Sequence, residues 1–81
     1  MFKILIVDDD PDVVEAVSLF LQKDHHEVAS AYDREEGMRK IAAFGPDLII
    51  LDVMMEQPDD GIAMAQDLRR SGNKKPIIML T

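Results

Sequence analysis

Each of three short apolar runs in the sequence is followed directly by residues that could do chemistry. Three aspartates follow the first run, one aspartate follows the second and a threonine follows the third: Asp8-Asp9-Asp10, Asp52 and Thr81. If the runs are parallel strands, their carboxyl ends meet at one edge of a sheet, where ligands bind in open α/β folds. Asp10 is assigned to a helix cap, and we expect the other side chains to converge although they are far apart in sequence.

The predicted group of carboxylates is suited to binding a cation. Carboxylates brought together repel one another unless a positive charge neutralises them. A hard, oxygen-liganded ion such as Mg²⁺ fits this requirement, because it takes one or two carboxylates and keeps several waters. An aspartate beside such an ion and a hydroxyl group can attack phosphorus to give an aspartyl phosphate. The alternative is that the three adjacent aspartates only form a solvated helix start, where acidic residues favour the helix dipole.

Seven alternating segments must position these residues. Short apolar runs rich in β-branched residues predict strands, and apolar residues at helical spacing predict helices. The expected strands cover residues 2–7, 27–31, 48–51 and 77–80. Between them, helices are expected over residues 11–22, 34–44 and 62–70. Because strands that alternate with helices imply right-handed crossovers, we predict a doubly wound α/β fold with a parallel sheet covered on both faces.

Start and stop signals bound the predicted helices. Each helix follows an acidic residue that can cap it, and glycines close two of the helices. The capping candidates are Asp10 before Pro11, Asp33 with Glu36 three residues later, and Asp59 with Asp60; the closing residues are Gly45-Pro46 and Gly72.

Apolar residues within the helices predict one buried face for each. They are Val13, Val14, Val17, Phe20 and Leu21 in the first helix, Met38, Ile41, Ala42 and Phe44 in the second, and Ile62, Ala65 and Leu68 in the third. Met38, Met64 and Met79 are interpreted as core-filling residues rather than as a binding stripe. Packing is also the favoured interpretation for Met54 and Met55.

The composition of the 81 residues argues against several classes of protein. Sixteen Asp and Glu outnumber nine Lys and Arg, so the net charge is −7 and direct nucleic-acid binding is not expected. The absence of cysteine excludes disulfides and cysteine-based zinc sites. The apolar runs are too short to span a membrane, and the apolar stretch at the start of the sequence is too short for a signal peptide. We therefore expect a cytoplasmic location without membrane contact.

Three segments of the sequence resemble the receiver domain of two-component response regulators. They are Lys3-Ile4-Leu5-Ile6-Val7-Asp8-Asp9-Asp10-Pro11, then Pro46-Asp47-Leu48-Ile49-Ile50-Leu51-Asp52-Val53-Met54-Met55, then Pro76-Ile77-Ile78-Met79-Leu80-Thr81. They occur in the family's order, and Gly61 follows the third expected strand. The resemblance covers essentially the whole chain. It implies a flavodoxin-like fold, with strand order 2-1-3-4 in the part present.

The resemblance implies a role for each matched residue of the site. Asp52 matches the phosphoacceptor, Asp9 matches the acid that binds Mg²⁺ directly, and Asp8 matches its neighbour that assists, often through water. Met54 matches the position whose backbone carbonyl is a metal ligand, and Thr81 matches the hydroxyl residue that hydrogen-bonds the phosphoryl group. The implied partners are a sensor histidine kinase or phosphotransfer protein, which donates from a phosphohistidine, and an output domain in a parent chain.

Two departures from the family pattern modify these expectations. The segment 56–61 is one residue longer than usual, and Glu56 is expected to approach the metal or its water. The family continues past the position of Thr81 with a fourth helix, a fifth strand and a fifth helix, which carry its site lysine. Residues 1–81 are therefore interpreted as the amino-terminal portion of a receiver domain. Lys74 and Lys75 precede the fourth expected strand, at the wrong end of the sheet to replace that lysine.

Together these features predict a Mg²⁺-dependent phosphoacceptor that acts as a signalling switch and not as an enzyme. Two alternatives stay open. One is a receiver-like interaction module that takes up no phosphate, and the other is a Mg²⁺-dependent phosphatase with an aspartyl nucleophile, which commonly has a second acid where Met54 stands. The fourth strand would also be an uncovered sheet edge, so we expect self-association through it.

Overall fold

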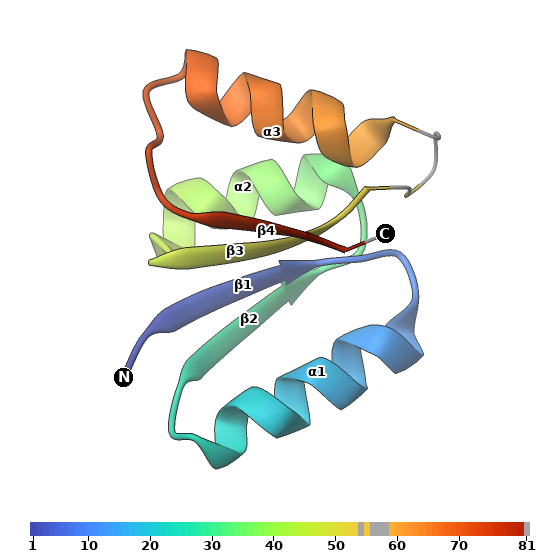
Figure 1. Ribbon diagram of the computed structural model, residues 1–81, viewed down its shortest axis with the longest axis vertical. Coiled ribbons are helices and arrows are strands. Elements are labelled where there is room, and N and C mark those ends of the chain that lie inside the picture. The colour runs from blue at the N-terminus through green and yellow to red at the C-terminus, as the bar shows by residue number, and fades with distance from the viewer. Residues whose placement is uncertain (54, 56–58, 81) are drawn as a thin grey trace.

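The computed structural model describes residues 1–53, 55 and 59–80, which form alternating strands and helices (Figure 1). In chain order these are β1 (Lys3–Val7), α1 (Pro11–Lys23), β2 (Glu27–Ala31), α2 (Arg34–Phe44), β3 (Leu48–Asp52), α3 (Asp60–Arg70) and β4 (Ile77–Leu80). The order agrees with the prediction, although β1 begins one residue later than expected and β3 extends to Asp52. None of the described helices is long and apolar enough to cross a membrane.

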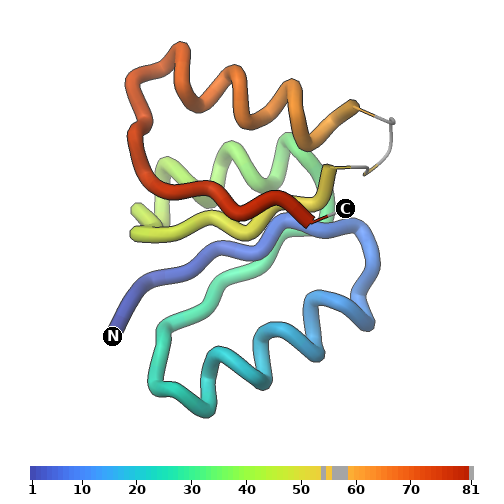
Figure 2. The backbone as a smooth tube through the Cα atoms, in the orientation of Figure 1, coloured from blue at the N-terminus to red at the C-terminus, as the bar shows by residue number. Residues whose placement is uncertain are grey.

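The four strands form one parallel sheet in the order β2-β1-β3-β4, which confirms the expected strand order (Figure 2). In the register, Leu5 of β1 is opposite Ala29 of β2 and Ile49 of β3. The strands run in one direction, so their carboxyl ends lie at the same edge of the sheet. That edge is where the acidic residues were expected to meet.

Successive side chains of each strand point to opposite faces of the sheet, so the core has two layers, one on each face. Figure 1 shows α1 on one face and α2 with α3 on the other. Leu5 and Val7 pack in the layer beneath α2 and α3, whereas Ile4 and Ile6 pack in the layer beneath α1. All four are at most 2% exposed. A continuous apolar run buried on both faces is typical of a central parallel strand, and this is how β1 is used.

Two of the three predicted helix caps form as expected. Asp10 accepts a hydrogen bond from the backbone N–H of Asp12, and Asp33 accepts one from the backbone N–H of Glu36 at 2.7 Å. Gly45 ends α2 with φ of 63°, a left-handed conformation that favours glycine. Asp59 occupies the N-cap position of α3, but its side chain makes no capping hydrogen bond to a described residue.

The buried faces of the helices differ in part from the prediction. In α1, Val14, Val17 and Leu21 face the sheet, while Phe20 is 69% exposed. The reason is helical phase: at 3.6 residues per turn, positions 14, 17 and 21 lie along one line and position 20 flanks it. The same effect turns Ile62 of α3 outward, at 47% exposed.

The core of the remaining helices follows the same geometry. The side chains of Met64 and Leu68 of α3 are part of the core, and Met38 and Ile41 of α2 pack against this core, whereas Ala42 is exposed. The prediction that Met38, Met64 and Met79 fill the core is confirmed, and Met55 is also buried.

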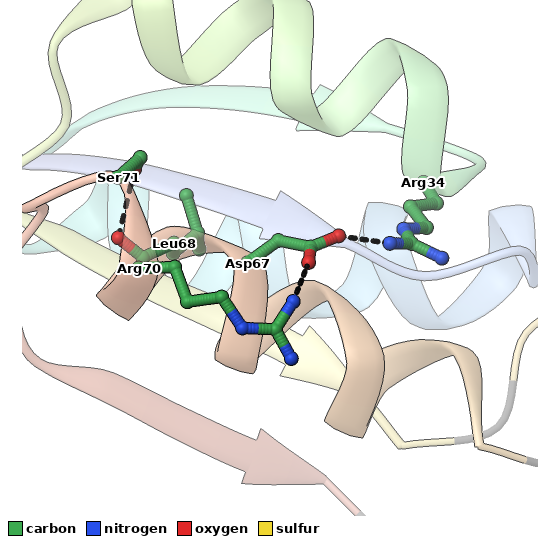
Figure 3. A network of polar contacts seen from close by, with 5 residues as sticks. All are labelled: Arg34, Asp67, Leu68, Arg70 and Ser71. Atoms are coloured by element: carbon green, nitrogen blue, oxygen red, sulfur yellow. Dashed lines mark hydrogen bonds and ion pairs between the residues drawn. The ribbon is translucent and has the colours of Figure 1, made fainter.

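An ion-pair network ties α2 to α3 (Figure 3). Asp67 of α3 pairs with Arg34 at the start of α2 and, at 3.0 Å, with Arg70 of its own helix. Ser71 Oγ donates to the carbonyl of Leu68 at 2.8 Å and helps to close α3. The charged side chains are partly exposed, so each pair contributes only about 0–1 kcal/mol. The network links the two helices and contributes little to stability.

Candidate functional site at the carboxyl edge of the sheet

The site is built on the ends of the two central strands. Val7 of β1 is opposite Leu51 of β3 in the register, so the residues that follow, Asp8 and Asp52, are neighbours across the ladder. The backbone N–H of Asp8 donates to the carbonyl of Ala31 at 3.1 Å, which joins this position to the end of β2 as well. The predicted approach of residues 8 and 52 is therefore a direct result of parallel pairing.

Three carboxylates meet at this edge. Asp8, Asp9 and Asp52 each offer an oxygen, and these atoms all lie within 4.8 Å of one another. Asp8 is buried, Asp9 is exposed and Asp52 is intermediate, so the cluster opens to solvent on one side. Mg²⁺ binds oxygens at about 2.0–2.1 Å, which requires ligand atoms no more than about 4.2 Å apart. The carboxylates fit such an ion after a small inward movement.

Burial and repulsion both act on the carboxyl group of Asp8. Desolvation is the largest effect and raises the pKa of Asp8 above its ordinary value. The negative charges of Asp52, Asp9 and Asp10 act in the same direction. The backbone N–H of Asp10, which donates to Asp8 Oδ1 at 2.9 Å, lowers the pKa and partly opposes them. The folded chain therefore holds a proton at Asp8 more readily than an isolated aspartate would.

Asp8, Asp9 and Asp52 line a pocket that Asp10 also lines, but the side chain of Asp10 hydrogen-bonds the backbone of α1. Its side-chain Oδ1 accepts from the N–H of Asp12 at 3.0 Å, which confirms its assignment as the cap of α1. Val13 and Leu80 also line the pocket, and the sequence reasoning did not name either as part of the site. Their positions in the sequence could have indicated both residues, because Val13 lies in the first turn of α1 after the aspartates and Leu80 is the last residue of β4.

Residue 53 connects the end of β3 to its neighbours. The N–H of Val53 donates to the carbonyl of Leu80 at 3.0 Å, and the carbonyl of Val53 accepts from the N–H of Gly61 at 2.9 Å. The chain immediately after Asp52 is thus held between the end of β4 and the first turn of α3. Met54, Glu56 and Thr81, for which the sequence predicts roles near the metal or the phosphoryl group, lie outside the described residues.

The remaining titratable candidates lie away from this edge. His25 and His26 precede β2, at the amino edge of the sheet, and His26 Nδ1 accepts from the backbone N–H of Phe2 at 3.1 Å. Lys74 and Lys75 are exposed and precede β4, also at the amino edge. These positions agree with the expectation that the four residues lie away from the carboxyl edge of the sheet.

Comparison with known proteins gives the class to which this fold and site belong. The family profile described as the response regulator receiver domain matches residues 4–81. The chain therefore belongs to the receiver domain family of two-component signal transduction.

Individual relatives agree with this assignment. The chain is 40% identical over 79 residues to the alkaline phosphatase synthesis transcriptional regulatory protein PhoP of Bacillus subtilis, covering 98% of this chain and 32% of that protein. It is 39% identical over 79 residues to response regulator MprA of Mycobacterium tuberculosis, and the match covers 98% of this chain and 34% of that protein. The chain thus spans about a third of the length of these curated relatives.

Solved structures show the same architecture. The N-terminal domain of a response regulator receiver protein from Methanoculleus marisnigri superposes with a TM-score of 0.92 at 32% identity, covering all of this chain and 67% of that one. The BeF3-activated N-terminal receiver domain of Klebsiella pneumoniae RstA gives a TM-score of 0.85 at 35% identity, covering 98% and 66%. These likenesses confirm the flavodoxin-like receiver fold.

Proposed function

We propose that this chain is a phosphoacceptor switch in which Asp52 takes up a phosphoryl group in a Mg²⁺-dependent reaction. The observation that carries the proposal is the meeting of Asp8, Asp9 and Asp52 at the carboxyl edge of the sheet. Two of these residues follow or end central strands that are buried on both faces, so their backbone is fixed before any ligand arrives and only a small movement of the carboxylates is needed. Such preorganisation is what phosphoryl transfer requires of a protein.

In the proposed reaction, an oxygen of the Asp52 carboxylate attacks the phosphorus of the donor. The new bond joins Oδ of Asp52 to phosphorus, and the bond from phosphorus to the donor nitrogen breaks. The electron pair of that bond leaves with the imidazole of a phosphohistidine, which then takes up a proton. Asp52 is only partly buried, which leaves a path for the donor.

Asp8, Asp9 and Asp52 are the proposed metal ligands, together with the backbone carbonyl of Met54. The bound Mg²⁺ supplies positive charge that neutralises the oxygens of the transferring group. Burial and the acidic neighbours raise the pKa of Asp8, so a positive charge at this site would offset the repulsion among the three carboxylates. Thr81 is proposed to hydrogen-bond the phosphoryl group and to report its presence to the surface.

The partners follow from the same proposal. A sensor histidine kinase or a phosphotransfer protein is the proposed donor, and the proposed location is the cytoplasm. We propose that residues 1–81 form the amino-terminal portion of a receiver domain, supported by the 67% coverage of the Methanoculleus structure. The relative PhoP is described as a transcriptional regulatory protein. This supports an output domain, in the parent chain, that acts in transcription.

The test is intact mass spectrometry after incubation with acetyl phosphate and Mg²⁺. The expected result is a single phosphoryl adduct that is lost in Asp52→Asn. Asp24→Asn is the matched control, because Asp24 is exposed at the end of α1, and it should be labelled like the parent. An adduct that persists in Asp52→Asn would overturn the assignment. Mg²⁺ binding without an adduct would instead indicate an interaction module, and turnover of a phosphomonoester would indicate a phosphatase.

A further inference from the structure

The first turn of α3 lies directly against the backbone of the proposed phosphoacceptor. Gly61, the second residue of this helix, is buried, and its N–H donates to the carbonyl of Val53 at 2.9 Å. Val53 follows Asp52, the last residue of β3. The helix and the strand end are therefore joined by a backbone hydrogen bond within one residue of Asp52.

The space at Gly61 is too small for any side chain. A Cβ atom placed there would lie 2.6 Å from Cα of Val53 and 2.8 Å from the carbonyl carbon of Asp52, and closer still to the carbonyl oxygen of Asp52. Real Cβ atoms essentially never approach other atoms within 3.0 Å. Because the opposing atoms are backbone, no rotamer change can relieve the clash, and either the helix or the strand end must move.

Gly37 gives a useful contrast within the same chain. A Cβ atom there would meet Cε of Met64 at 2.8 Å and the methyl groups of Val7 at 3.2 Å. The nearest of these atoms is the end of a flexible side chain, which can give way by changing rotamer. Only at Gly61 does the contact fall on the backbone of the acceptor residue itself.

We propose that Gly61 is a positioning residue: its lack of a side chain lets α3 seat against Asp52 and so fixes the acceptor carboxylate relative to Asp8 and Asp9. The inference rests on the proposed function and extends it to a residue that has no side chain to offer to a metal or a phosphoryl group. Where the end of β3 yields to a methyl group at position 61, it moves relative to the end of β1, where Asp8 and Asp9 follow. Misplacement of a reacting group by about 1 Å lowers a rate by about 10²-fold.

The experiment compares Gly61→Ala with Gly72→Ala. Gly72 follows the opposite end of α3 with φ of 91°, and among the described residues nothing lies within 4 Å of a Cβ atom there. Alanine at position 72 therefore strains the same helix without touching the site. For each variant, the rate of labelling by acetyl phosphate is divided by the folded fraction, which is obtained from circular dichroism.

Two further measurements report on the site without any phosphoryl transfer. Titration calorimetry gives the Mg²⁺ affinity of each folded variant, and nuclear magnetic resonance gives the amide shifts of Asp52 and Val53. For Gly61→Ala we expect labelling slower by a factor of about 10 to 100, weaker Mg²⁺ binding and shifted amides. Gly72→Ala should lose stability and keep all three properties.

Equal labelling rates and equal Mg²⁺ affinities in folded Gly61→Ala and the parent would overturn the inference and leave the proposed function standing. A parent that takes up no phosphate would remove the proposed function, and the role of Gly61 would then be decided by Mg²⁺ affinity and amide shifts. If Gly61→Ala is unfolded, the measurements are repeated in sucrose, which favours the compact state. Failure to fold there, while Gly72→Ala folds, would show a purely structural glycine and would also overturn the inference.

Discussion

The buried carboxylate of Asp8 lowers the stability of the folded domain, although the proposed metal site requires it. It is only 5% exposed, and Asp9 and Asp52 lie within reach of it. Its pKa is raised in the folded chain, so the native state binds this proton more tightly than the unfolded state does. Stability therefore falls as the pH rises from the ordinary carboxyl pKa through the raised value, and it stays lower above that value.

The first prediction concerns Asp8→Asn in the presence of a chelator. Asparagine keeps an oxygen that can accept from the N–H of Asp10, but it carries no charge. At neutral pH the variant should be more stable than the parent toward urea, and the difference should shrink as the pH falls below the ordinary carboxyl pKa. The exposed Asp9, changed to Asn, is the control and should gain less. A variant less stable than the parent at neutral pH would contradict the prediction.

The acidic residues of the site could be predicted from sequence because a simple rule places them. Parallel strands end at one edge, so Asp8 and Asp52 had to meet once the runs before them were recognised as strands. The close seating of Gly61 against Asp52 could not be predicted in the same way. It depends on how α3 docks on β3, a tertiary distance that no local pattern encodes.

At the scale of single elements, the N-caps of α2 and α3 form a natural comparison. Asp33 accepts from the N–H of Glu36 at 2.7 Å, and Asp59 makes no such bond to a described residue. Asp33→Ala should cost about 1 kcal/mol, because capping hydrogen bonds contribute roughly 0.5–2 kcal/mol.

Thermal unfolding checks this second prediction. For a domain of this size, a loss of about 1 kcal/mol lowers the melting temperature by about 4–8 °C. Asp59→Ala is the matched control, with a smaller expected decrease because only its interaction with the helix dipole is removed. Equal decreases in the two variants would show that the hydrogen bond at Asp33 adds nothing.

The kinds and order of the elements could be predicted, whereas the orientation of individual side chains on the helices could not. Phe20 belongs to the apolar pattern of α1, and Ile62 belongs to that of α3, yet both point outward. A sequence pattern with several apolar residues per turn fits more than one helical phase. The choice between the phases depends on the shape of the sheet surface, and Val14 and Met64 fit against it.

At the scale of the whole molecule, the two edges of the sheet differ. Along β2, Lys40 of α2 donates to the carbonyl of Ser30, and Glu36 accepts from the N–H of Tyr32 at 2.8 Å. Lys40 and Glu36 also pair with each other at 3.6 Å. These side chains therefore hydrogen-bond backbone groups at the edge formed by β2. β4, at the other edge of the described sheet, presents Ile78 at 48% exposed.

The third prediction is that the 81-residue chain associates through β4. An exposed edge strand with an apolar side chain is a template for pairing with another chain, and a lysine on the edge discourages this pairing. Sedimentation velocity should therefore show concentration-dependent association in the parent and a smaller effect in Ile78→Lys. Phe20→Lys, on the exposed side of α1, is the control and should associate like the parent. A strictly monomeric parent would contradict the prediction.

The position of the acidic residues on β1 and β3 has a consequence for local opening of the molecule. These two strands are central, each hydrogen-bonded on both sides, while β2 and β4 lie at the edges of the described sheet. Edges and termini open at low free energy, whereas central strands open only when the whole domain unfolds. Amide exchange at the edges can therefore proceed while Asp8, Asp9 and Asp52 stay together. The strand ends that carry the proposed cation site are therefore expected in the slowest-exchanging part of the described chain, and the site should outlast local opening of the edge strands.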